Sequence, residues 1–173
     1  MILGLSVPTF TLLHVIISLV AIGSGLIAVV GMLGSRRMPG WTGLFLGMTV
    51  LTSATGFLFP ITGFTPALGV GAISLALLTG ALFALYAQHL DGPWRWIYVV
   101  TAVAALWFNI FVLIVQSFEK LTILNPKAPQ VGPPFAEPQN THFVIAESVA
   151  LIVMILLGAL AVRRFRLGVI LAS

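Results

Sequence analysis

Long apolar stretches alternate with short polar breaks along the whole chain. The apolar stretches cover residues 7–33, 41–59, 66–88, 93–118 and 142–162. A helix rises about 1.5 Å per residue, so about 20 residues cross the apolar core of a bilayer. Proline marks several breaks, as at Pro39, Pro66 and Pro93, where a helix can begin but not continue. The pattern predicts an all-α integral membrane protein, a bundle of five transmembrane helices that forms one domain over residues 1–173.

The composition agrees with lipid as the solvent of this protein. The chain is 60% hydrophobic and only 7% charged, whereas a soluble domain carries about 25% charged residues. It has no cysteine, which excludes disulfides, thiolate ligation and iron–sulfur clusters. The basic residues stand at the ends of the apolar stretches and form no stripe with interleaved aromatics, so we do not expect nucleic-acid binding.

The basic residues are distributed unequally between the two sides of the predicted bundle. Lys120 and Lys127 fall on one side, and six arginines fall on the other: Arg36, Arg37, Arg95, Arg163, Arg164 and Arg166. By the positive-inside rule the arginine side is cytoplasmic. The N-terminus is then outside and the C-terminus cytoplasmic. The short breaks suit a multi-pass protein of a bacterial inner (cytoplasmic) membrane, which is the location we expect.

Residues 119–140 form the one long break, and it lies on the predicted outer side. This loop is rich in proline, which fixes φ and removes a hydrogen-bond donor, so we expect an extended segment. Its apolar side chains indicate that it folds over the outer end of the bundle or docks onto a partner. The docking candidates are Val131, Pro133, Pro134 and Phe135. The alternative is a semi-rigid tether between the fourth and fifth helices.

Glu147 is the clearest candidate for a functional residue within the predicted spans. An acid inside a membrane helix is costly and is a functional candidate by default. From the rise per residue, His14 lies at about the depth of Glu147, and Asn109 lies in the same outer half. We therefore predict one outer-half polar cluster, in which Glu147 pairs with His14 or Asn109. The cluster is a candidate ligand or proton site, and interhelical hydrogen bonding alone is the alternative.

The sequence assigns no catalytic residue. It contains no GxSxG, HExxH or Gly-rich phosphate-binding motif, so we expect a protein that is not an enzyme. His14, His142 and Glu147 are suitable metal ligands by type but form no ligand motif, and no metal site is predicted. His14 and His142 differ in depth by about 8–9 Å, which disfavours their pairing as axial ligands of one haem. No cofactor is predicted, and haem b or quinone stays an alternative.

The first two stretches carry a resemblance to known proteins. Leu13-His14-Val15 and Gly23-Ser24-Gly25 are followed by a short basic turn and a Gly/Thr-rich second stretch. This layout resembles that of small uncharacterised bacterial inner-membrane proteins, some of them cytochrome-b561-like. A haem-binding relative would have a histidine in the second helix, whereas this stretch begins Trp41-Thr42-Gly43. No haem ligand is carried over from the resemblance.

Three functions are compatible with these features. The leading hypothesis is a small accessory subunit that scaffolds or regulates a larger membrane protein complex. Its partners would be the lipid bilayer and either other membrane proteins or a second copy, because small residues such as Gly43 and Gly47 let helices approach closely. The first alternative is a proton- or cation-linked transporter or channel that uses the outer-half cluster. The second is a redox module that binds quinone or haem.

Overall fold

The protein is all-helical in the part of the chain that the computed structural model describes, residues 1–60, 66–124 and 141–166. These residues form five α-helices and no strand: α1 (Val7–Leu33), α2 (Pro39–Gly56), α3 (Pro66–Leu82), α4 (Trp94–Lys120) and α5 (Thr141–Arg164). A π-helical turn, η1 (Phe83–Ala87), continues α3. The predicted all-α class is confirmed.

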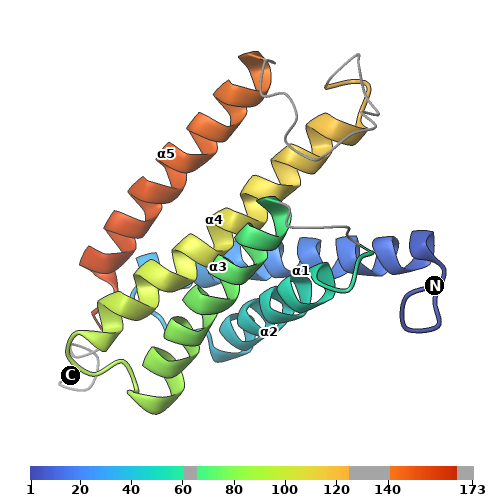
Figure 1. Cartoon of the computed structure of the whole chain (residues 1–173). Coiled ribbons are helices and arrows are strands. Elements are labelled where there is room, and N and C mark those ends of the chain that lie inside the picture. The colour runs from blue at the N-terminus through green and yellow to red at the C-terminus, as the bar shows by residue number, and fades with distance from the viewer. Residues whose placement is uncertain (61–65, 125–140, 167–173) are drawn as a thin grey trace.

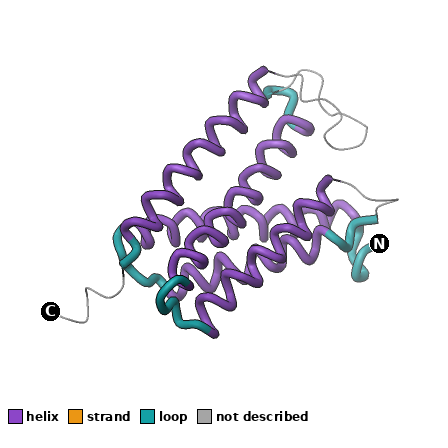
Figure 2. Tube along the Cα trace, turned by 60° about the vertical axis from the view of Figure 1, so that its left-hand side comes forward, coloured by secondary structure: helices purple, strands orange, loops and turns teal. Residues whose placement is uncertain are grey.

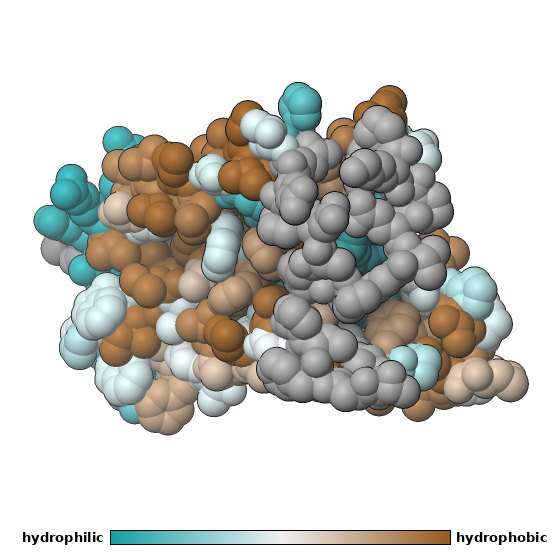
Figure 3. All heavy atoms as spheres, turned by 45° about the horizontal axis from the view of Figure 1, so that its top comes forward, coloured by the Kyte–Doolittle hydropathy of each residue, from teal (hydrophilic) through white to brown (hydrophobic). Residues whose placement is uncertain are grey.

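Four helical segments are long and apolar enough to cross a membrane, which suggests a multi-pass membrane protein. They are Val7–Leu33, Ala67–Ala87, Trp94–Lys120 and Thr141–Arg164. Hydrophobic residues accordingly form several large areas on the face in Figure 3. Helix α2 is not among the four. It has 18 residues, fewer than each of the four, and many of them are glycine or hydroxyl-bearing. That α2 also spans the membrane stays a prediction, as does the orientation of the termini.

Local sequence explains where the helices begin and end. The Ser6 hydroxyl accepts a 3.3 Å hydrogen bond from the Thr9 amide and caps α1. Proline stands in the first turn of both α1 and α2, where its missing N–H is harmless. At the far end of α3 the chain turns sharply, because His89 and Leu90 both adopt positive φ, at 51° and 66°. The turn returns the chain into α4.

The helices converge at one end and diverge at the other. Figure 1 shows α5 beside α4, α4 beside α3, and α1 passing behind them. Among the described residues α5 contacts α4 and α1 but neither α2 nor α3. The arginine-bearing turns and the end of α5 gather at one end, whereas the N-terminus and the start of α5 lie well apart in Figures 1 and 2. Residues that the sequence places at the same depth on different helices can therefore lie far apart.

All five helices contribute to the core, and Gly25 allows the close approach of α1, α2 and α4 within it. A Cβ atom at Gly25 would lie 2.7 Å from Leu106 Cδ1 and 2.8 Å from Phe45 Cδ2. Leu106 and Phe45 are both almost fully buried. The absence of a side chain at Gly25 is thus what lets α2 and α4 pack against α1, as small residues do between membrane helices.

Helix α5 is fixed mainly at its C-terminal end. Ala161 and Phe165 are buried there. The Ser35 hydroxyl donates to the Arg166 carbonyl and accepts from the Arg166 amide, both at 3.0 Å. Arg95 donates to the Phe165 carbonyl. Toward its start α5 is more exposed, and Phe143 keeps it against Phe118 of α4, with the ring centroids 5.6 Å apart.

Candidate functional site

Three threonines of α2 hold most of the described polar contacts between helices. Thr49, Thr52 and Thr55 stand three residues apart, and we call them the threonine row. Each has a partner on another helix: Asn109 Nδ2 donates to Thr49 Oγ1 (3.1 Å), Ser18 Oγ lies 3.4 Å from Thr52 Oγ1, and His14 Nδ1 lies 2.8 Å from Thr55 Oγ1. The threonine row therefore joins α2 to α1 and α4 by side-chain hydrogen bonds.

His14 lies between α1 and the end of α2. Its ring is edge-on to Phe59, with the ring centroids 5.3 Å apart. The Thr55 hydroxyl already donates to the Leu51 carbonyl over 2.7 Å. Because a hydroxyl has one proton, Thr55 accepts from His14, which places the ring proton on Nδ1. His14 thus binds α2 through Nδ1 and keeps a lone pair on Nε2.

Asn109 begins a short series of hydrogen bonds in the core that runs through Thr49 to Phe45. It is 9% exposed, and its acceptor Thr49 is fully buried. The Thr49 hydroxyl in turn donates to the Phe45 carbonyl over 2.8 Å. Donor and acceptor are matched at each step, so the arrangement satisfies buried polar groups and joins α4 to α2.

Glu147 stands apart from the threonine row. It lies on α5 one turn before Leu151, on the side of the helix that faces α4. Both carboxylate oxygens are buried, and neither has a hydrogen-bond partner among the described residues. The predicted pairing of Glu147 with His14 or Asn109 is wrong for this part of the chain, because those two residues bond to Thr55 and Thr49. The divergence of α5 from α1 and α2 is the physical reason.

The candidate residues consequently form separate groups and not one outer-half cluster. His14 and Asn109 bond to the two ends of the threonine row, and Glu147 is on a helix that α2 does not contact. His14, His142 and Glu147 are not brought together as ligands, since no group of three potential metal ligands occurs in the described residues. Val131, Pro133, Pro134 and Phe135 lie outside the described residues.

Sequence reasoning missed the importance of the threonine row. Hydroxyls in helices usually bond to the carbonyl one turn earlier, and Thr49 and Thr55 do so here. That bond uses the hydroxyl proton and leaves the oxygen free to accept from another helix. The signal in the sequence was the spacing of three in the least apolar stretch.

Comparison of the chain with protein-family models, with curated proteins and with solved structures finds no match.

Proposed function

We propose that this protein is a small integral membrane subunit that binds other membrane proteins and scaffolds or regulates their complex. The observation that carries the proposal is the buried carboxyl group of Glu147, which has no partner among the described residues and stands on the least covered of the four spanning helices. A buried polar group without a partner is destabilising, and lipid tails offer it none. A hydrogen-bond donor from a second protein would remove this cost.

The surface around Glu147 supports a protein partner. The first two thirds of α5 expose large apolar side chains over about half of the circumference of the helix: Val144, Ile145, Val149, Leu151, Ile152, Val153, Ile155 and Leu156. Glu147 itself is only partly buried and lies one turn before the exposed Leu151, at the edge of this surface. An apolar surface with an acid at its edge favours a transmembrane helix that carries a donor such as Ser, Asn, Lys or His at the matching depth.

The test compares two neighbouring substitutions on α5. Tagged wild-type protein, Glu147→Leu and Ser148→Leu are purified in mild detergent, and the co-purifying proteins are identified and quantified. We expect wild-type protein and Ser148→Leu to retain a defined partner, and Glu147→Leu to lose it while remaining folded. Ser148 is exposed beside Glu147, so it controls for the added apolar volume.

Two outcomes would contradict the proposal. One is wild-type protein that purifies alone as a monomer from its native membrane. The other is a partner that Glu147→Leu retains in full, because Glu147 would then have no part in binding.

A further inference from the structure

A groove of about 480 Å³ runs between α4 and α5 in the half of the molecule nearer the basic end. Small residues create it. At Gly158 the two helices approach closely, because a Cβ atom there would lie 3.3 Å from Val103 Cγ1. Beside this contact, Ala104 on α4 and Ala159 on α5 line the groove with little volume. The helices touch along one line and leave a furrow next to it.

The length of the groove matches one leaflet of a bilayer. Its lining on α5 extends from Leu151 to Arg163, which corresponds to about 18 Å of helix. Half of a hydrocarbon core of about 30 Å is about 15 Å. The groove therefore begins at the polar boundary, at Arg163, and ends near the middle of the membrane.

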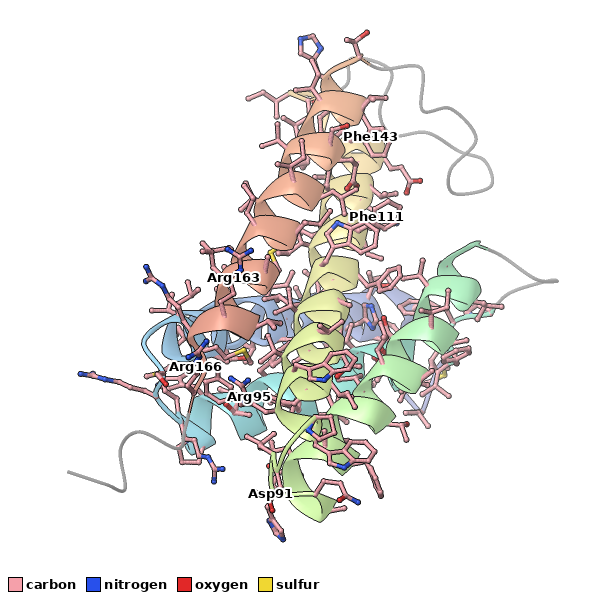
Figure 4. The ribbon with its side chains drawn as sticks, turned by 90° about the vertical axis from the view of Figure 1, so that its left-hand side faces the viewer. Asp91, Arg95, Phe111, Phe143, Arg163 and Arg166 are labelled. Carbon is pink, nitrogen blue, oxygen red and sulfur yellow. The ribbon has the colours of Figure 1, made fainter. Side chains whose placement is uncertain are left out.

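The charge at the open end of the groove is positive and unbalanced. Arg163 is the single charged residue among those that line the groove, and its side chain is exposed. In the described part of the chain Arg163 bonds to Arg166 through its backbone carbonyl, and its guanidinium makes no hydrogen bond. Figure 4 shows Arg95, Arg163 and Arg166 gathered near the end of α5, whereas Asp91, the acidic residue of that end, lies apart from Arg163. An apolar wall accepts the chain of any lipid, so the charge decides which lipid binds.

We propose that the groove binds one phospholipid with an anionic headgroup, its phosphate on Arg163 and one acyl chain between α4 and α5. Arginine suits this role because its planar guanidinium binds phosphate oxygens in pairs and never loses its charge. Arg95 and Arg166 already bond to carbonyl groups of the chain, whereas the Arg163 guanidinium is unbonded as far as the described residues extend. The charge thus selects an anionic lipid, and the length of the groove places that lipid in the leaflet on the arginine side.

Trp107 provides a direct measurement, because it lines the groove about halfway along the span. The protein is reconstituted in phosphatidylcholine vesicles that contain either bromine-labelled phosphatidylglycerol or bromine-labelled phosphatidylcholine at equal mole fraction. Bromine on an acyl chain quenches tryptophan fluorescence on contact, and the part of the quenching that Trp107→Phe removes reports the groove. We expect about a fivefold preference for phosphatidylglycerol, the effect of roughly one basic side chain on an anionic lipid.

Two variants, each with a matched control, decide whether the groove is the site. Arg163→Gln is expected to abolish the preference, and Arg164→Gln, its neighbour of equal charge outside the groove, to keep it. Ala159→Leu fills the groove and is expected to reduce quenching of Trp107 although Arg163 is intact. Ala76→Leu, at an exposed position of α3, is the control for added volume and should change nothing.

Several results would overturn the proposal. Equal loss in Arg163→Gln and Arg164→Gln would indicate a general effect of surface charge. Unchanged quenching in Ala159→Leu would place the acyl chain elsewhere. Quenching of Trp107 by neither lipid would mean that a second copy or a partner helix fills the groove.

Discussion

The side-chain amide of Asn109 on α4 donates a 3.1 Å hydrogen bond to the hydroxyl of Thr49 on α2, and both residues are buried. The two ends of this bond are not equivalent. Thr49 also donates to the Phe45 carbonyl, so its proton stays bonded if Asn109 is lost. Asn109 has no such second contact among the described hydrogen bonds.

Substitution at the two ends should therefore have unequal effects on stability. Thr49→Val leaves the Asn109 amide buried and unpaired and should lower the free energy of unfolding by about 1–3 kcal/mol. Asn109→Leu keeps the volume and leaves Thr49 bonded, so its effect should be smaller, near the average of about 0.6 kcal/mol for hydrogen bonds between membrane helices. Unfolding titrations in detergent measure both values, and a larger loss in Asn109→Leu would contradict the assignment.

The His14–Thr55 contact predicts an unusual tautomer of the imidazole ring. At neutral pH the proton should reside on Nδ1, because the Thr55 hydroxyl donates to Leu51 and only accepts from the ring. Nitrogen NMR of His14 distinguishes the two tautomers through the chemical shifts of the ring nitrogens. Thr55→Val removes the acceptor and should move the proton to Nε2. A wild-type ring already protonated on Nε2 would reverse the donor and acceptor assigned here.

Two glycines of α1, Gly23 and Gly25, differ in how closely other helices pack against them, so their alanine variants can be compared directly. Gly25→Ala places a methyl group within 3 Å of Leu106 and Phe45, which are too buried to move freely, and should destabilise the protein by about 1–3 kcal/mol. Gly23→Ala meets nothing within 4 Å and should be neutral, or stabilising by up to about 1 kcal/mol through helix propensity. Thermal unfolding of the purified variants compares the two, and equal effects would show that the close approach at Gly25 is not tight.

Removal of the carboxyl group of Glu147 should stabilise the isolated protein. The sequence alone suggests the opposite, since loss of a bonded acid would leave its partner unsatisfied. With no partner among the described residues, Glu147→Leu removes a buried unsatisfied group, and the free energy of unfolding should rise by about 1–3 kcal/mol. Glu147→Gln leaves a polar group unpaired and should change little. Destabilisation by Glu147→Leu in purified monomer would reveal an internal partner.

The predicted orientation is accessible to labelling, because the chain has no native cysteine. Lys120 ends α4 and Arg164 ends α5, and both are exposed at opposite ends of these helices. A membrane-impermeant thiol reagent applied to intact cells should label Lys120→Cys, and should label Arg164→Cys only after the membrane is opened. The reverse pattern would invert the topology.

Helix positions follow from the sequence because long apolar runs and their breaks are unambiguous. Helix α1 covers the predicted residues 7–33, and α4 and α5 each extend about one turn or less beyond the predicted limits. Helix α2 ends at Gly56, three residues before the predicted limit, where Phe57 already lies in a turn. These small shifts are the normal uncertainty of helix ends.

The contacts of the candidate residues do not follow in the same way. Depth along each helix placed Glu147 beside His14 and Asn109, but depth carries no information about how helices tilt and diverge. Except for α4, the helices are also apolar on nearly every side, so no amphipathic stripe shows which side turns inward. The pairing of Asn109 with Thr49 depends on helix rotation, which packing at sites such as Gly25 determines.

The π-helical turn at Phe83–Ala87 is a place where the chain can lose one residue without disturbing the helices on either side. The Gln88 amide reaches back to the Phe83 carbonyl, so this turn holds one residue more than an α-helical turn would. Deletion of the exposed Tyr86 can close the turn to α-helical geometry without rotating α3 or α4. A deletion within α4 would instead turn every later side chain by about 100°. Homologous chains that differ by a single residue in length should carry that difference at this corner.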